Sequence, residues 1–204
     1  MMKLHNKVDM LRQDQTGVAA IEMAFVLPPF ILMFLGAFDV GYSMYFRGVL
    51  DGAIQESARA SALESAIAVT NDKTGAALQD ERLEKKLKDL AVDIDVTFDR
   101  KSYFSFQDVE RPEKFTESNA NGVCDNNEQY EDENDNQTWD EDAGKDGVGG
   151  PKDVVLYTVT VTYNRIFPLW AFVGQSQKNT FSASTVLKNQ PYDSQQISAV
   201  RNCT

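Results

Sequence analysis

The sequence predicts an α+β protein in which a long N-terminal helix packs on a small antiparallel sheet, with an acidic loop insertion at residues 108–150. Three observations lead to this fold class. An apolar run fills residues 18–38, a stretch with helical spacing follows it, and three later segments alternate apolar and polar residues. A chain of 204 residues has room for one membrane helix and one compact domain.

The apolar run predicts a membrane-spanning segment at residues 18–38. At a rise of about 1.5 Å per residue, it is long enough to cross most of a hydrocarbon core about 30 Å thick. Its only charged side chain is Glu22. An ionised carboxylate inside a span costs about 2.5–3.5 kcal/mol on insertion scales, so we expect Glu22 to have a charged partner.

Residues 1–17 have the composition of a leader that faces the cytoplasm, because their Lys and Arg side chains outnumber their Asp side chains. Cleavage between Gly17 and Val18 would create a new α-amine on Val18 and make Glu22 the fifth residue of the mature chain. Glycine at the cut, glutamate at the fifth position and an apolar helix resemble a type IV prepilin. The resemblance implies that a prepilin peptidase removes residues 1–17 and that Glu22 neutralises the new amine within the membrane. The alternative is an uncleaved signal anchor in which Glu22 lies near the interface by chance.

Helical spacing without proline continues through residues 39–70 and predicts that the helix extends beyond the membrane, with Leu50 and Ile54 on a buried side. The opening GVAAIEMAFVLPPFILMFLGAFDVG, the small-rich SARASAL and the near-terminal STVLKNQPY also resemble the TadE-like family of minor pilins or pseudopilins of tight adherence (Tad) pili. Met23 stands where major pilins of this system have tyrosine, which favours a minor pilin.

The TadE resemblance implies a pilin-like architecture and a non-enzymatic role in assembling or priming a Tad pilus for adhesion. It implies a single-pass protein of the bacterial inner membrane whose soluble domain lies in the periplasm. The protein would either stay in the membrane or enter the pilus outside the cell. Its expected partners are the inner membrane, prepilin peptidase, other Tad pilins and assembly platform proteins. The alternative is a membrane-anchored calcium-binding adhesion module that does not polymerise.

Residues 71–204 are predicted to form the soluble α+β domain. An amphipathic helix is expected at 76–90, and strands are expected at 92–98, 153–163 and 180–187. The apolar segment between the last two strands contains Trp170 and Phe172, which would either pack within the domain or form an exposed contact.

Charge and histidine content exclude several functions. The net charge of −11 is concentrated in residues 108–146, which would repel nucleic acid, so no nucleic-acid partner is expected. The only histidine is His5, within the predicted leader, and a mature chain would therefore lack His-dependent catalysis. A carboxylate-based hydrolase using Asp132 and Asp140 would need a defined separation and a cleft, which the sequence does not reveal.

The acidic loop predicts a calcium site, since residues 117–128 follow the pattern D-x-[DN]-x-[DN]-G-x₅-E except for Glu117 in the first place. The spacing recurs from Asp132, but Gln137 replaces the glycine and Ala143 the closing glutamate. The two copies would share ligands, with Asp132 bridging, or hold one strong and one weaker ion. The alternative is a solvated, disordered acidic insertion. The candidate ligands are Glu117, Asn119, Asn121, Val123, Asp125, Glu128, Asp132, Asn134, Asn136, Asp140 and Asp142.

Two cysteines, Cys124 and Cys203, lie in the segment that would be exported. An oxidising compartment permits a disulfide between them, which would tie the acidic loop to the C-terminus. The alternative is a pair of unrelated thiols.

Overall fold

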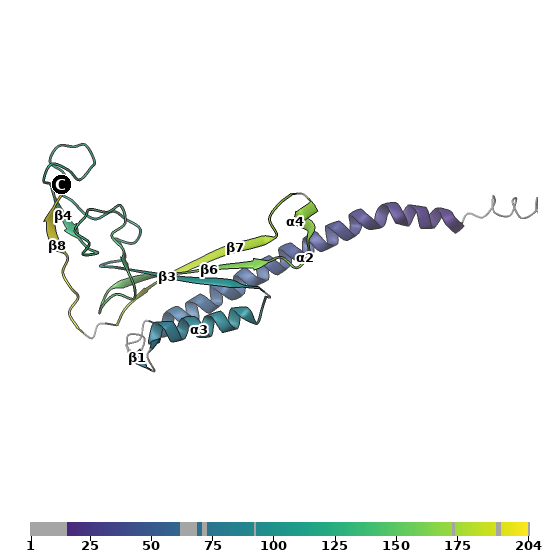
Figure 1. The fold of residues 1–204 in the computed structure, drawn as a ribbon, viewed down its shortest axis with the longest axis horizontal. Coiled ribbons are helices and arrows are strands. Elements are labelled where there is room, and N and C mark those ends of the chain that lie inside the picture. Colours follow the sequence, from purple (N-terminus) through teal and green to yellow (C-terminus); the bar gives the residue numbers. More distant parts are fainter. Residues whose placement is uncertain are drawn as a thin grey trace, which may run out of the picture. The chain divides into compact units, whose positions relative to one another are not determined.

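The computed structural model describes residues 16–61, 69–70, 73–91, 93–172, 174–190 and 193–203. Most of the predicted leader therefore lies outside the described residues. The helices are α2 (Thr16–Ser61), α3 (Gly75–Lys88) and α4 (Leu169–Phe172), and the strands are β1 (Val69–Thr70), β2 (Lys73–Thr74), β3 (Asp95–Tyr103), β4 (Gln129–Asp132), β5 (Lys145–Asp146), β6 (Val154–Asn164), β7 (Lys178–Lys188) and β8 (Ala199–Asn202) (Figure 1). The predicted α+β fold class, with a long N-terminal helix and a small antiparallel sheet, is confirmed.

The chain forms two compact units, and α2 contributes to both. One unit contains the described residues up to Tyr45 together with Arg165–Gln177, and the other contains Phe46–Asn164 and the chain from Lys178 onward. The sheet-containing unit begins at Phe46, and the second half of α2 covers its sheet.

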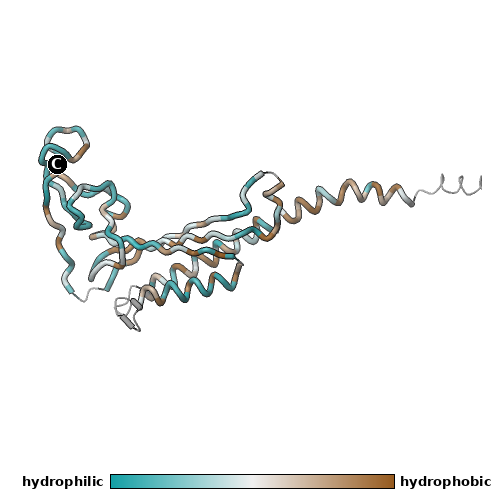
Figure 2. Tube along the Cα trace, viewed as in Figure 1, coloured by the Kyte–Doolittle hydropathy of each residue, from teal (hydrophilic) through white to brown (hydrophobic). Residues whose placement is uncertain are grey.

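The first half of α2 is apolar and exposed. Figure 2 shows this part of the helix as predominantly hydrophobic. The helix continues through Pro28 and Pro29, and its segment Gly17–Ala60 is long and apolar enough to cross a membrane. Because none of the apolar window is buried within the chain, its apolar side chains require lipid or another helix as their surroundings.

The larger unit contains a four-stranded antiparallel sheet in the order β5-β3-β6-β7. The central strand β6 alternates as predicted, and its buried set includes Val155, Tyr157, Val159, Val161 and Tyr163. Its register pairs Val159 with Phe98 on β3 and with Ala183 on β7. This alternation places one row of side chains under the helices.

The second half of α2 covers the sheet through residues spaced at helical intervals. Phe46, Leu50 and Ile54 are buried, and the ring of Phe46 lies 4.9 Å from the ring of Tyr163 on β6. Each of these buried side chains contributes about 1.5–3 kcal/mol relative to full exposure. The burial predicted for Leu50 and Ile54 is therefore observed.

Helix α3 lies on the same face of the sheet and is held there by a part-buried polar cluster. Asp80 receives two hydrogen bonds of 2.6 Å from Arg100 on β3 and one of 2.7 Å from Tyr157 on β6. The guanidinium of Arg100 also lies 4.1 Å above the ring of Tyr157. Leu83 and Leu87 are buried, as the amphipathic spacing predicts.

Two boundaries differ from the sequence predictions. Helix α2 ends at Ser61 and Val69–Thr70 form a strand, so the predicted helical extension to residue 70 ends early; residues 62–68 lie outside the described residues. Strand β3 begins later than predicted and continues to Tyr103. The polar stretch 99–102 gave no local strand signal, because its pairing depends on β6 and on the partners of Arg100.

Candidate functional site

The N-terminal part of α2 presents the predicted processing residues. Val18 is 52% exposed, and Glu22 is exposed with no hydrogen bond or ion pair to any of the described residues. Among the described residues, a Cβ atom added at Gly17 would meet nothing within 4 Å, so packing against this part of the chain does not require glycine there. Glu22 therefore needs a partner outside the described part of the chain.

Residues 117–128, the first acidic loop, fold into a tight turn around their own side chains. The carboxylate of Glu117 accepts hydrogen bonds from the backbone N–H groups of Asn121 (3.2 Å) and Gly122 (2.9 Å). Ala120 and Gly122 adopt positive φ angles of 59° and 75°. The glycine of the calcium pattern thus occupies a position that favours glycine conformationally.

The interior of the first loop gathers amide and carboxylate groups. Asn119 and Asn121 donate from their side-chain amides to Asp125 at 2.8 and 2.9 Å. The closing residue Glu128 accepts from the backbone N–H groups of Ser118 (2.7 Å) and Asp125 (3.2 Å), which are the second and ninth places of the loop. The hydrogen bonds from Ser118 lower the pKa of the Glu128 carboxyl.

Residues 132–143, the second acidic loop, begin with the same backbone arrangement despite the degenerate sequence. Asp132 accepts from the N–H groups of Asn136 (3.1 Å) and Gln137 (3.0 Å). Asp135 and Gln137 have φ angles of 61° and 72°, at the places that Ala120 and Gly122 hold in the first loop. Gln137 therefore adopts the conformation that the pattern assigns to glycine.

Glu113 closes the second loop, although it lies 19 residues before Asp132 in the sequence. Its carboxylate accepts from the N–H groups of Glu133 (2.8 Å) and Asp140 (3.2 Å), again the second and ninth places. Asn134 and Asn136 donate to Asp140, as their counterparts donate to Asp125 in the first loop. Glu113 therefore occupies the place that Glu128 holds in the first loop, while Ala143 is buried elsewhere.

Antiparallel pairing between two segments delivers Glu113 to this position. The N–H of Thr116 donates to the carbonyl of Gln129 (2.7 Å), and the N–H of Glu131 donates to that of Lys114 (2.9 Å). The Glu113 side chain is fully covered, and burial raises the pKa of its carboxyl above the ordinary value. The calcium pattern cannot reveal this residue, because the pattern is read along one continuous segment.

Each loop offers a donor set that suits calcium in number and chemistry. Three carboxylates, two asparagine side chains and one backbone carbonyl per loop match the 6–8 oxygen ligands of Ca²⁺. Among the described residues, however, no three His, Cys, Asp or Glu side chains converge as a metal cluster. The carboxylate oxygens accept hydrogen bonds from backbone N–H groups and from asparagine side-chain amides. Calcium binding would therefore require the asparagine side-chain oxygens to turn inward.

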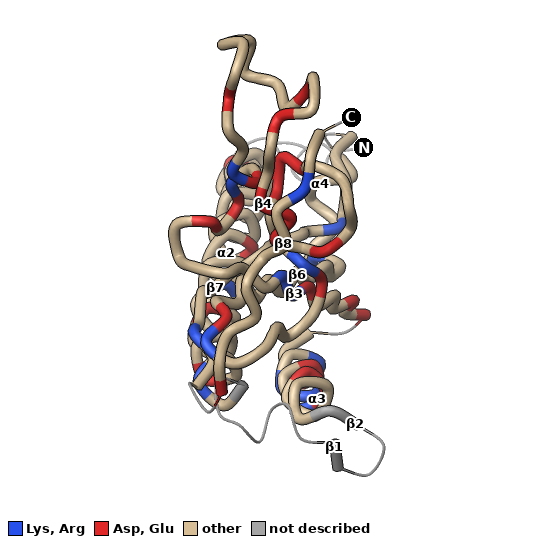
Figure 3. Tube along the Cα trace, turned by 90° about the vertical axis from the view of Figure 1, so that its left-hand side faces the viewer, with Lys and Arg blue, Asp and Glu red and all other residues tan. Residues whose placement is uncertain are grey.

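Two predicted ligands have other partners. Asp142 accepts from Lys101 (2.6 Å) and from the hydroxyl of Tyr103 (3.0 Å), both on β3, so its carboxylate is engaged outside the second loop. Although burial opposes it, these hydrogen bonds lower the pKa of the Asp142 carboxyl. Asp132 pairs with Arg201 of β8 and contributes to the second loop only, so it does not bridge the two loops. Figure 3 marks Asp and Glu positions in red along the trace, and several of them lie around β4 and β8.

A disulfide ties the first loop to the C-terminal strand. Cys124 and Cys203 are bonded with their Cα atoms 5.6 Å apart, and the N–H of Cys203 donates to the carbonyl of Glu128 at 2.8 Å. Strand β8 pairs with β4 immediately before the second loop. The C-terminal segment is therefore linked to the first loop by the disulfide and to the start of the second loop by the β4–β8 pairing.

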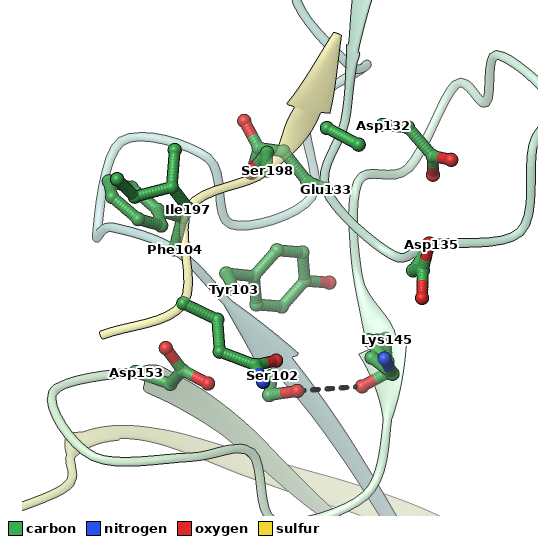
Figure 4. A pocket seen from close by; sticks show the side chains of 12 residues that line it. Ser102, Tyr103, Phe104, Asp132, Glu133, Asp135, Lys145, Asp153, Ile197 and Ser198 are labelled. Atoms are coloured by element: carbon green, nitrogen blue, oxygen red, sulfur yellow. Dashed lines mark hydrogen bonds between the residues drawn. The ribbon is translucent and has the colours of Figure 1, made fainter. Parts of the chain in front are cut away.

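A polar pocket of about 370 Å³ lies between the end of β3, strand β5 and the segment before β8 (Figure 4). Its lining includes Tyr103, Asp132, Glu133 and Lys145. The hydroxyl of Ser102 donates to the carbonyl of Lys145 at 3.0 Å and is not paired with a base. Asp132 and Asp140, the pair considered for hydrolysis, are each engaged within the second loop.

Comparison with known proteins supports the reading of the N-terminal helix. No curated protein and no solved structure matches the chain. Residues 17–59 match a family model described as TadE-like protein, which confirms the resemblance predicted from the sequence over this segment. The match covers Gly17, Glu22 and nearly all of α2, whereas the sheet and the acidic loops lie outside it. The long N-terminal helix of this chain is thus similar to the TadE-like family over residues 17–59.

Proposed function

We propose that the protein is a non-enzymatic minor pilin or pseudopilin that helps to assemble or prime a Tad-type pilus for adhesion. The observation that carries this proposal is the TadE-like match over residues 17–59, on a helix whose apolar half is exposed in the single chain. An exposed helix of this kind is completed by lipid before assembly and by neighbouring helices after it.

Prepilin peptidase would cut between Gly17 and Val18 and release the leader on the cytoplasmic side of the inner membrane. The new amine of Val18 would then lie about one helical turn from Glu22, close enough to pair within one chain or between neighbours. The absence of any described partner for Glu22 supports this role. The soluble unit would face the periplasm, where its disulfide can form.

Contacts between subunits would use the exposed side of α2. Added Cβ atoms at Gly48 and Gly52 would meet nothing within 4 Å in the part of the chain that the structure describes, so packing against that part does not require small residues there. These glycines lie one helical turn apart and would let the backbone of a neighbouring helix approach closely.

We also propose that calcium orders the two acidic loops. In each loop a first-place carboxylate and a closing glutamate hold equivalent backbone N–H groups, so the turn is already formed. Calcium would neutralise the three carboxylates of each loop, which otherwise repel one another. This geometry also favours the second candidate, a membrane-anchored calcium-binding adhesion module that does not polymerise.

Complementation of a Tad-piliated host that lacks this gene separates the two candidates. Glu22→Gln should abolish the sheared pilus fraction and surface adhesion, because the amine loses its carboxylate. The matched control is Glu56→Gln, which changes an exposed glutamate of the same helix that pairs with Lys86. Wild-type piliation by the Glu22→Gln variant would contradict the pilin proposal and favour the anchored module.

A further inference from the structure

The connection between β6 and β7, residues 165–177, exposes a group of apolar side chains. Phe172 is 81% exposed and Ile166 is 58% exposed, and Trp170 lies between them in the sequence at 36%. The segment contains Arg165 and no acidic residue, in a chain whose net charge is −11. Water is an unfavourable environment for this surface.

Backbone hydrogen bonds hold the connection in shape. The N–H of Arg165 donates to the carbonyl of Gln177 (2.9 Å), and the N–H of Gln175 donates to that of Trp170 (2.8 Å). Gly174 turns the chain with a φ of 71°. The apolar side chains are therefore not needed to fold the turn, and Ile166 and Phe172 remain exposed.

Two polar contacts join the connection to one residue of α2 within the same compact unit, and a third contact links the two connection residues to each other. Arg165 forms an ion pair with Asp39, whose side chain is 3% exposed, and the indole N–H of Trp170 donates to Asp39 at 3.0 Å. The guanidinium of Arg165 lies 4.7 Å from the centre of the Trp170 ring. The Asp39 carboxylate thus accepts from both the guanidinium of Arg165 and the indole N–H of Trp170, although the buried Nε of Arg165 has no hydrogen-bond partner among the described residues.

The position of Asp39 in the sequence places this cluster at the end of the predicted membrane span. It directly follows Phe38, the last residue of the apolar span. At about 1.5 Å per residue, a helix over residues 18–38 is about 30 Å long, the thickness of a hydrocarbon core. Asp39 and the connection tied to it therefore lie where hydrocarbon gives way to headgroups, the level at which tryptophan side chains concentrate.

We propose that residues 166–172 insert into the surface of the same bilayer that α2 crosses. Ile166 and Phe172 enter the boundary between headgroups and acyl chains, while Arg165 and Asp39 remain at the polar level. The lipid surface is the partner, because the segment continues the apolar surface of the span and carries no negative charge to repel anionic lipid. This second contact fixes the depth of the helix and its rotation about its axis. The inference rests on the proposed membrane span.

Tryptophan fluorescence of the full-length chain in liposomes tests the insertion directly. The chain has two tryptophans, so Trp139→Phe leaves Trp170 as the only reporter. We expect lipids brominated near the headgroup to quench Trp170 strongly, and lipids brominated near the bilayer centre to quench it weakly. In the matched control, Trp170→Phe, the remaining Trp139 reports on the acidic region and should not be quenched by lipid.

A second variant and an extraction control separate the possible failures. Ile166→Ser with Phe172→Ser should remove most of the lipid quenching of Trp170, since the apolar tips are lost.

Carbonate extraction reports the span alone. If the chain resists extraction while Trp170 is quenched only by aqueous acrylamide, the insertion is wrong and the span stands. Protection of Trp170 from both quenchers would indicate a neighbouring protein copy and would also overturn the proposal. Release of the chain by carbonate would contradict the span itself.

Discussion

The equivalence of Glu113 and Glu128 makes a quantitative prediction for Glu113→Gln. The substitution keeps one oxygen for the N–H of Glu133 but turns an amide nitrogen toward the N–H of Asp140, 3.2 Å away in the wild type. A buried donor left without a partner costs about 1–3 kcal/mol, so the variant should be less stable even in chelator. This loss does not depend on calcium and therefore does not test the proposed site.

The calcium-dependent part of the stability does test it. At a free calcium concentration of about 100 times Kd, one site stabilises the folded state by about 2.7 kcal/mol. Changes to groups that only support metal ligands weaken binding by about 10–100-fold, so we take about 100-fold for loss of a ligand carboxylate. The stabilisation by calcium at the second loop should then fall to about 0.4 kcal/mol at the same concentration.

Urea unfolding in calcium and in chelator measures this difference. The matched control is Glu133→Gln, which removes a neighbouring buried carboxylate whose pKa is also raised by burial but which pairs with Lys114 outside the loop interior. Glu133→Gln should change the stability in chelator and keep the calcium-dependent gain. Equal calcium-dependent gains in the wild type and Glu113→Gln would refute the assignment of Glu113 as the closing ligand.

Three further predictions concern the larger unit. Gln137→Gly should stabilise the protein by about 1 kcal/mol in thermal unfolding, because it removes a side chain from a left-handed backbone position, and Gly122→Ala should have the opposite sign. In chelator, burial raises the pKa of Glu113 above its ordinary value of 4.5, so the folded state keeps a proton that the unfolded chain releases. The stability that this proton contributes is present below pH 4.5 and is lost as pH rises through the raised pKa, so Glu113→Gln should flatten the decline that urea titrations measure as pH rises above 4.5. Asp80→Ala should cost about 3–5 kcal/mol in urea unfolding, because it leaves Arg100, whose side chain is only 11% exposed, without a carboxylate. A loss below about 1 kcal/mol would contradict this account of how α3 is held.

Sequence periodicity located the two long helices, α2 and α3, and the main strands, because burial on one face imposes the period; the short α4 gave no such signal. The alternation of β6 matches its buried face residue by residue, and Leu83 and Leu87 lie where helical spacing places them. Strand β8 gave no such signal: Val200 is exposed, and the strand is held by pairing with β4 and by the disulfide at Cys203. Partners of this kind are distant in the sequence, so local patterns do not reveal them.

The acidic loops show the same division between local and distant information. The spacing from Glu117 to Glu128 predicted the first loop because its partners lie within one turn of chain. The second loop has glutamine in the glycine position, and its closing carboxylate arrives from Glu113 through strand-like pairing. Asp142 fitted the sequence pattern, but its carboxylate accepts hydrogen bonds from Lys101 and Tyr103 of β3.

Intact mass and N-terminal sequencing of the membrane-extracted protein test the central claim most directly. The chain should be expressed with and without a prepilin peptidase. The account predicts a peptidase-dependent chain that begins at Val18, with Glu22 as its fifth residue. A chain that keeps Met1 in the presence of an active peptidase would contradict the prepilin mechanism and would favour the anchored calcium-binding module.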